Sequence, residues 1–192
     1  MERRNDKGFP MNSIQPSLDY ALFDSPPGWV LAAASSSGLC MVHFCGGKAP
    51  SPSKAVELLR PLGPDAAVHQ NPGSPLIEEA LRAFQAYLTS GTPLPPLPLD
   101  FRIGTPFQRQ VWQALCQIPF GETRTYLEIA REVNRPEGAR AVGQACGRNP
   151  LPMIVPCHRV LRSGGQLGGY TGGLAIKEFL LQLEAESEAL RP

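Results

Sequence analysis

The sequence predicts two structural units in one chain. The first, residues 17–92, is an α/β unit with an antiparallel sheet and helices; the second, residues 105–186, is mostly helical and contains a helix-turn-helix. Short apolar segments between turn residues predict the strands, and apolar residues three and four positions apart predict the helices. A proline-rich stretch, Pro93 to Pro98, lies between the two patterns and predicts a stiff linker over 93–104. Residues 1–16 are expected to form a flexible arm and residues 187–192 a tail.

Composition excludes several classes of protein. The chain has 192 residues, of which 42% are hydrophobic and 18% charged, so it can bury a core and is not a disordered polymer. No segment approaches the roughly 20 consecutive apolar residues that a membrane helix needs. The polar residues 1–10 do not resemble a secretory signal, and five cysteines, an odd number, argue against a disulfide scaffold. We therefore expect a soluble protein of a reducing compartment, the cytoplasm (or the nucleus if the source is eukaryotic), with no membrane partner.

The first unit begins with a predicted three-stranded meander. Its strands are expected at Leu18–Phe23, Trp29–Ala34 and Leu39–Phe44, because turn-forming residues separate these apolar runs. Helical spacing follows over Ser53–Leu62 and over Leu76–Leu88.

The second unit begins with a helix after Thr105-Pro106, since proline is favoured in a first helical turn. Two shorter helices follow, over Tyr126–Val133 and Ala139–Gly147, with a turn at 134–138 between them. Helix, tight turn and helix is the outline of a helix-turn-helix, although a helical hairpin without DNA contacts has the same outline.

Positive charge is concentrated in this region. Residues 101–162 contain nine arginines, no lysine and four glutamates. Arginine suits phosphate and planar groups, which favours nucleic-acid recognition, although a solvated basic face would give the same count.

The second helix of the pair is unusually thin. Five of the nine residues 139–147 are alanine or glycine, and a glycine inside a helix, such as Gly143, costs about 0.5–1 kcal/mol relative to alanine. Close approach to a DNA groove, with Arg140 pushed into the base stack, would explain these residues. Close packing of two helices with Arg140 at the surface is the alternative.

Cys157 is the candidate nucleophile. The apolar run Ile154-Val155-Pro156 is expected to be a strand that ends at Cys157, and His158 follows directly. A free thiol has a pKa of about 8.5 and needs a neighbouring base to react at neutral pH. Alternation along a strand would place the two side chains on opposite faces, so contact requires a turn or a water; a buried structural cysteine is the alternative.

The segments after Cys157 suggest a binding site. Six glycines fall within residues 164–173, interrupted by Tyr170 and Thr171, so this loop can close over a planar ligand and offer hydrogen bonds. Glu178, near the start of the next predicted helix, can orient an imidazole. Cys40, His43 and Cys45 do not have the spacing of a structural zinc site, and no metal is expected.

Taken together, these residues resemble a known family. The block Pro156-Cys157-His158-Arg159-Val160, with Asn149-Pro150 upstream and Tyr170-Thr171-Gly172-Gly173 downstream, is similar to that of the 6-O-alkylguanine-DNA alkyltransferases. The resemblance is close over Thr105 to Leu183 and covers the first unit in outline. It implies a ribonuclease-H-like first domain and a winged-helix-like second domain.

The resemblance also implies residue roles. Cys157 matches the alkyl acceptor, His158 the base that acts through a water, and Glu178 the carboxylate that orients the imidazole. The guanine would be held by Tyr126, Val160, Tyr170 and Thr171, the last standing where some members have serine, and by the main-chain carbonyls of Cys157 and Val160. DNA would be bound in the minor groove, with the target base flipped out, by Tyr126, Ala139, Arg140, Ala141, Gly143 and Asn149.

The implied function is direct-reversal DNA repair. Cys157 would take an alkyl group from 6-O-alkylguanine, and also from 4-O-alkylthymine, in one irreversible turnover with no cofactor. Double-stranded DNA would be the partner, and the protein would act as a monomer. A helix-turn-helix sensor of alkylated DNA without chemistry is the alternative, although relatives of that kind lack the cysteine. A cysteine hydrolase is the third hypothesis, and it leaves the arginines and the thin helix unexplained.

Overall fold

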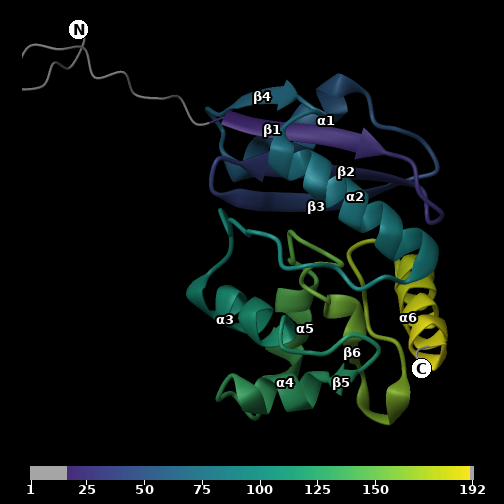
Figure 1. Ribbon diagram of the computed structural model, residues 1–192. Coiled ribbons are helices and arrows are strands. Elements are labelled where there is room, and N and C mark those ends of the chain that lie inside the picture. The colour runs from purple at the N-terminus through teal and green to yellow at the C-terminus, as the bar shows by residue number, and fades with distance from the viewer. Residues whose placement is uncertain (1–16, 191–192) are drawn as a thin grey trace, which may run out of the picture.

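The computed structural model describes residues 17–190. The predicted arm 1–16 and the last two residues of the predicted tail lie outside this range. A four-stranded sheet with two helices forms one half of the molecule, and a group of short helices joined by loops forms the other (Figure 1). The fold confirms the predicted combination of an α/β unit and a mostly helical unit.

The sheet is a meander with one added strand. Strands β1 (Ser17–Phe23), β2 (Trp29–Ser35) and β3 (Gly38–Gly46) pair antiparallel as predicted. Strand β4 (Ala67–Gln70), which we did not predict, pairs parallel with β1 and gives the order β3-β2-β1-β4.

Each face of the sheet packs on a different helix. Helix α1 (Pro52–Leu59), followed by a 3-10 turn at Arg60–Leu62, covers one face in a small cluster that includes Leu31 and Cys40. Helix α2 (Pro75–Ser90) covers the other face, and its buried residues belong to the main core. Ser51 caps the start of α1, and Gly91, with φ of 63°, ends α2 in a left-handed conformation that glycine adopts without strain.

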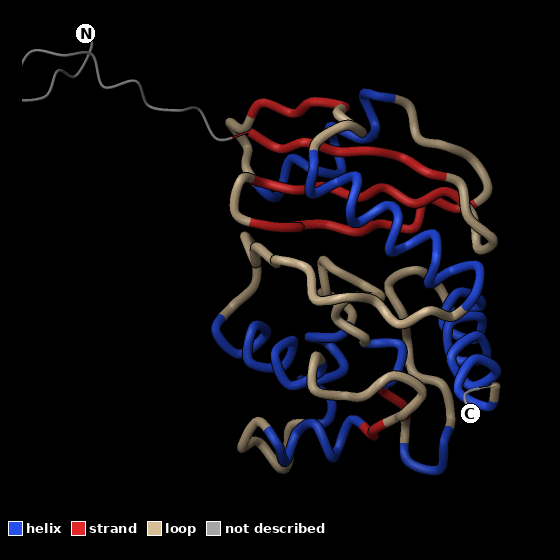
Figure 2. The backbone as a smooth tube through the Cα atoms, viewed as in Figure 1, coloured by secondary structure: helices blue, strands red, loops and turns tan. Residues whose placement is uncertain are grey.

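The open edge of the sheet is covered by the rest of the chain. Strand β3 lies at the edge, and the linker pairs with it: Leu39 N donates to Pro98 O, and Asp100 N donates to Leu39 O, both at 2.8 Å. Further along β3, Val42 N donates to Pro150 O at 2.8 Å. Figure 2 shows these loops between the sheet and the helices. The covered edge thus joins the sheet to the segment that leads to Cys157.

The helical half consists of α3 (Pro106–Leu115), α4 (Tyr126–Glu132), α5 (Ala139–Cys146) and α6 (Leu174–Ala189). Capping boxes at Thr105–Gln108 and Thr125–Glu128 fix the starts of α3 and α4. Trp112 Nε1 donates to Ala145 O at 2.9 Å and holds α3 against α5. The short strands β5 (Arg124–Thr125) and β6 (Val160–Leu161) pair parallel.

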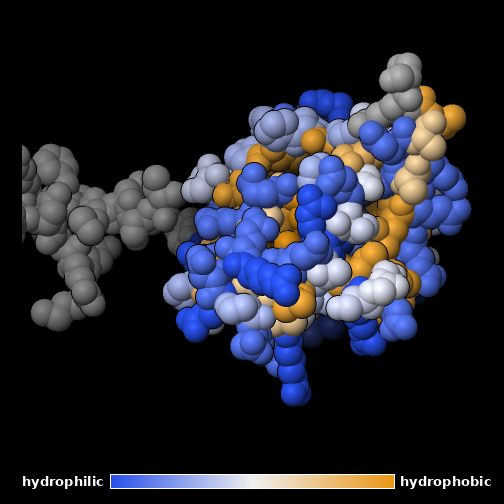
Figure 3. Space-filling view, turned by 90° about the horizontal axis from the view of Figure 1, so that it is seen from below, coloured by the Kyte–Doolittle hydropathy of each residue, from blue (hydrophilic) through white to orange (hydrophobic). Residues whose placement is uncertain are grey.

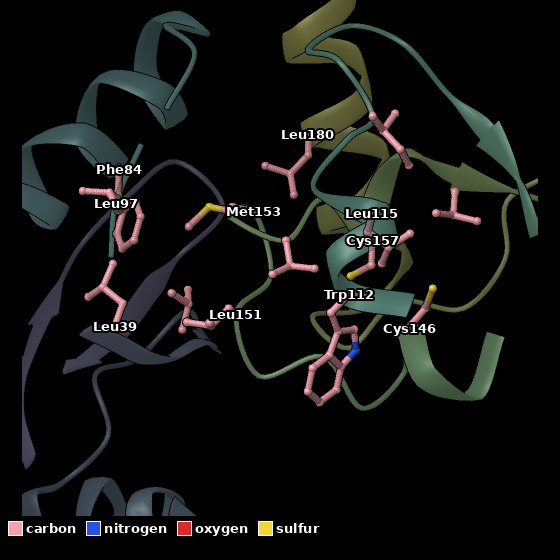
Figure 4. Packing of buried hydrophobic residues seen from close by; sticks show 14 of the residues in the cluster. Leu39, Phe84, Leu97, Trp112, Leu115, Cys146, Leu151, Met153, Cys157 and Leu180 are labelled. Carbon is pink, nitrogen blue, oxygen red and sulfur yellow. The ribbon is translucent and has the colours of Figure 1, made fainter. Parts of the chain in front are cut away.

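One continuous core connects the two halves. Figure 4 shows buried side chains from Leu39 and Phe84, on the sheet side, to Trp112 and Cys157, on the helical side. The segment that contains Cys157 is therefore packed in the main core of the protein.

One expectation needs correction. Residues 154–156 form a turn, not a strand, and Cys157–Arg159 is a 3-10 helix. Met153 just before it has φ of 73°, a conformation that an extended strand does not allow. Helix α6 continues to Ala189, into the predicted tail. No helix within residues 17–190 is long and apolar enough to cross a membrane.

Candidate active site and DNA interface

Cys157 is buried, with only 2% of the residue exposed. Asn149 holds it: Asn149 Nδ2 donates to Cys157 Sγ at 3.1 Å and to Val155 O at 2.8 Å, and Asn149 Oδ1 accepts from Leu151 N at 2.9 Å. One buried amide thus fixes both the thiol and the loop before it.

Burial raises the pKa of the Cys157 thiol to about 11, although the hydrogen bond from Asn149 and the charge of Lys177 act in the opposite direction. The thiol is therefore protonated at neutral pH, and its reaction requires a base.

His158, the predicted base, follows Cys157 directly, and its side chain is completely buried. Its Nε2 is 2.9 Å from Glu184 Oε1. Burial lowers the pKa of His158, so the imidazole is neutral at neutral pH. Because Nε2 faces a carboxylate, it carries the proton; Nδ1, which has no hydrogen-bond partner among residues 17–190, is the basic nitrogen.

Glu184 is held by several donors besides His158. Arg159 Nε donates to Glu184 Oε2 at 2.9 Å, Arg159 Nη2 to Oε1 at 2.9 Å, and Gly121 N to Oε2 at 3.1 Å. Burial alone would raise the pKa of Glu184, but the hydrogen bonds from His158 and Arg159 outweigh it and lower this pKa well below its usual range. The carboxylate is therefore ionised.

The prediction that Glu178 orients His158 is wrong. Glu178 is exposed, whereas Lys177, Leu180 and Glu184 form the buried face of α6. The spacing of three and four residues along this face was the signal in the sequence, since Glu178 lies about 100° around the helix from Lys177.

Lys177 was missed by sequence reasoning, as was Arg159. Lys177 is completely buried, and its Nζ donates to Val160 O at 2.6 Å. Burial lowers the pKa of Lys177. The Val160 carbonyl, predicted as an acceptor for guanine, thus already accepts one hydrogen bond; its second lone pair remains for a ligand.

The glycine-rich loop carries Tyr170 and Thr171. The Tyr170 hydroxyl is buried and has no hydrogen-bond partner in the described part of the chain. Its ring centroid lies 6.4 Å from that of His158. Thr171 is exposed, and its hydroxyl is 3.4 Å from Gly147 O. A phenol donor is therefore available next to His158, and a second hydroxyl lies at the rim.

A cavity of about 700 Å³ brings half of the twelve predicted site residues together, whereas the buried Cys157, His158, Val160 and Asn149 do not line it. Helices α4 and α5 and the glycine-rich loop line it, and the predicted site residues among its lining are Tyr126, Ala139, Arg140, Gly143, Tyr170 and Thr171. Ala141 is exposed on α5 and lines a neighbouring hollow with Phe107 and Pro136. Figure 3, which views the molecule from the side of α4, shows a largely hydrophilic face.

Glycines keep the contact between Tyr126 and the loop close. A Cβ on Gly168 would clash with the Tyr126 ring. At Gly143, by contrast, a Cβ would lie 3.7 Å from Tyr126 Cε1, an ordinary contact. An alanine would therefore fit at this position of α5. Close packing of two helices does not explain why residue 143 is glycine.

No group of three or more potential metal ligands occurs within residues 17–190. Cys40 donates to Ala33 O at 3.4 Å, and burial raises the pKa of its thiol to about 12. This cysteine is part of the packing between the sheet and α1.

The sequence matches two family profiles. Residues 18–101 match the ribonuclease-like domain of 6-O-methylguanine DNA methyltransferase, and residues 106–186 match its DNA-binding domain. A methylated-DNA–protein-cysteine methyltransferase of Methanosarcina acetivorans is 45% identical over 168 residues, which cover 86% of this chain and 97% of that protein. One from Mycobacterium bovis is 38% identical, covering 87% and 92%.

The fold is similar to that of solved structures. The Mycobacterium tuberculosis OGT in complex with DNA has a TM-score of 0.72 and 36% identity, covering 88% of this chain and 94% of that one. The O6-methylguanine-DNA methyltransferase of Pyrococcus kodakaraensis has a TM-score of 0.59 and 26% identity, covering 88% and 99%. Two domain profiles, full-length relatives and full-length structural neighbours therefore agree: this chain belongs to the 6-O-methylguanine DNA methyltransferase family.

Proposed function

We propose that this chain repairs alkylated DNA by moving the alkyl group from 6-O-alkylguanine to the sulfur of Cys157. Its family gives the enzyme class, a methylated-DNA–protein-cysteine methyltransferase acting by direct reversal, with DNA as the partner. The observation that supports the assignment to Cys157 is its burial next to His158 in the chain, with Glu184 Oε1 2.9 Å from His158 Nε2.

The transfer is a single displacement. The thiol proton passes through a bridging water to His158 Nδ1 while the sulfur attacks the alkyl carbon. The S–C bond forms as the C–O6 bond breaks, and its electron pair goes to the guanine. Glu184 stabilises the imidazolium that results. Hydrogen-bond donors neutralise the departing guanine, and the unpartnered Tyr170 hydroxyl is the leading candidate.

The base is held by the walls of the site. Tyr126, from α4, and Tyr170 and Thr171, from the glycine-rich loop, line the cavity that takes the base. The carbonyls of Cys157 and Val160 accept hydrogen bonds from the guanine amino group. The same site takes 4-O-alkylthymine, which presents a similar alkylated oxygen. The product sulfur is a thioether with no group to displace it, so each protein molecule acts once.

DNA binds with α5 in the minor groove and the damaged base flipped into the cavity. A stacked base keeps its alkylated oxygen out of reach, so extrusion is required. Arg140 is exposed at the start of α5 and fills the space that the base leaves, while the small residues Ala139, Ala141 and Gly143 let the helix backbone approach the groove. Tyr126 crowds the 3′ phosphate, and Asn149 ties this helix to the reactive loop.

The protein acts as a monomer in the cytoplasm, where a reducing environment keeps its thiols free. All five cysteines are unpaired in the structure.

Counting methyl groups tests the single use of the protein. The protein is incubated with excess duplex that carries labelled 6-O-methylguanine, and protein-bound label is measured over time. The proposal predicts a plateau at one methyl group per molecule, and none for Cys157→Ala. Continued transfer beyond one equivalent would contradict it.

A further inference from the structure

Tyr87, near the end of α2, connects the sheet half with His158 and Glu184. Its side chain is completely buried. The hydroxyl donates to Glu184 Oε1 at 2.5 Å, and its oxygen is 3.3 Å from His158 Nε2. Figure 1 shows the end of α2 next to α6, the helix that carries Glu184.

The direction of this hydrogen bond follows from the charges. Burial and the nearby Glu184 raise the pKa of Tyr87 well above its usual value, so the phenol keeps its proton. It has one hydrogen to give, and the ionised Glu184 is the stronger acceptor. The lone pairs of the Tyr87 oxygen are then left facing His158 Nε2.

That direction reinforces the tautomer of His158 that the Glu184 carboxylate favours. Two oxygens, Glu184 Oε1 at 2.9 Å and Tyr87 Oη at 3.3 Å, both face Nε2 as acceptors. Nε2 must then carry the hydrogen, and Nδ1 must be the unprotonated nitrogen. With Tyr87 absent, a single carboxylate oxygen would be left to orient the ring.

We propose that Tyr87 is a positioning residue of the alkyl transfer: its hydroxyl, supplied by the ribonuclease-like half, locks His158 in the tautomer whose Nδ1 is the base. The proposal rests on the proposed role of His158. It gives the sheet half a part in the chemistry, because α2 brings a side chain into hydrogen-bond contact with the base and its carboxylate.

The test uses Tyr87→Phe, which removes the hydroxyl and keeps the ring that packs edge-on against Phe120 at 6.2 Å. Tyr20→Phe is the matched control, since Tyr20 is also a buried tyrosine of the sheet half, with its hydroxyl 3.4 Å from Gln70 Oε1. Single-turnover transfer from methylated duplex, DNA affinity and the 15N shifts of His158 are measured. Replacing the other two histidines, His43 and His69, by glutamine leaves one imidazole signal.

For Tyr87→Phe we expect transfer to slow about tenfold with unchanged DNA affinity. We also expect the 15N shifts of His158 to move from those of the Nε2–H tautomer alone toward the average of the two tautomers. Tyr20→Phe should change neither. A transfer rate within twofold of the parent, even with a lower melting temperature, would mean that the hydroxyl is only structural. A slower rate with unchanged shifts would overturn the tautomer lock.

The parent protein supplies two independent checks. A signal of the Nδ1–H tautomer in the parent overturns the proposal even if Tyr87→Phe does not fold. Failure of the parent to place a methyl group on Cys157 overturns the proposed function instead, so the two failures are distinguishable.

Discussion

The two faces of the sheet have opposite relations to the reactive site. The face under α1 packs in a small cluster, separate from the main core, that contains Cys40. The Cys40 thiol donates to Ala33 O on the neighbouring strand. The face under α2 is continuous with the core around Cys157, and α2 reaches Glu184 through Tyr87. Both cysteines are buried, but Cys157 is followed directly in the chain by a buried histidine, His158. Burial alone therefore makes a cysteine inert, and the neighbouring imidazole makes it a candidate nucleophile.

Replacing each cysteine should give the largest contrast. Cys157→Ala should abolish methyl transfer while DNA binding persists, because the sulfur is the acceptor. Cys40→Ala should keep the full rate per folded molecule. Single-turnover assays on methylated duplex, with a gel-shift measurement of binding, check both. Residual transfer in Cys157→Ala would refute its role.

The two glutamates of α6 give the next contrast. Glu184→Gln should slow transfer about a hundredfold, because the imidazolium loses its stabilising charge. Glu178→Gln, on the exposed face of the same helix, should stay within about twofold of the parent. Equal losses in the two variants would contradict the geometry of the site.

Arg140→Ala should slow transfer from duplex about tenfold and leave the reaction with free alkylguanine unchanged, since flipping is needed only in duplex. Arg82→Ala is the control, because Arg82 lies on α2 and pairs with Glu78 at 2.7 Å. Rates on the two substrates are compared for each variant. Equal losses on both substrates would contradict the proposal that Arg140 fills the space left by the flipped base.

The pH dependence should be shallow near neutrality. Burial lowers the pKa of His158 below its ordinary 6.5, so the imidazole is already neutral at pH 7. The transfer rate should be level above about pH 6.5 and should fall as the pH drops through the lowered pKa. A rate that rises about tenfold per unit from pH 6.5 to 8.5 would indicate a preformed thiolate instead.

The smallest effect on transfer is expected in the α1 cluster. Leu59→Ala should cost about 3 kcal/mol of unfolding free energy but leave the rate per folded molecule unchanged. Leu180→Ala, in the core beside the site, should cost a similar free energy and also slow transfer. Urea unfolding and single-turnover assays, run side by side, separate the two effects. The comparison fails if both variants slow transfer equally.

Local signals explain what the sequence could predict. Helix α4 was expected over Tyr126–Val133 and is observed over Tyr126–Glu132. Thr125 and Glu128, three residues apart, form the capping box that fixes its start. The meander followed from clear turns. Strand β4 was missed because it has four half-exposed or exposed residues and no apolar alternation.

Sequence reasoning found the site residues that lie close together in the sequence. It missed those that are far apart in the sequence and meet only in the folded chain. Cys157, His158 and Asn149 lie within nine residues of one another in the sequence, and Asn149 donates to the Cys157 thiol, a contact that was not predicted. Glu184 and Tyr87 lie 26 and 71 residues from His158. Only tertiary packing brings them together. The choice of Glu178 ignored the buried face of α6, which the helical period could have revealed.

Peptide mapping after exposure to one equivalent of methylated duplex tests the account most directly. Digestion and mass spectrometry locate the added methyl group among the five cysteines. The account predicts that it lies on Cys157 alone, with Cys40, Cys45, Cys116 and Cys146 unmodified. Repaired DNA together with an unmodified Cys157 would contradict it.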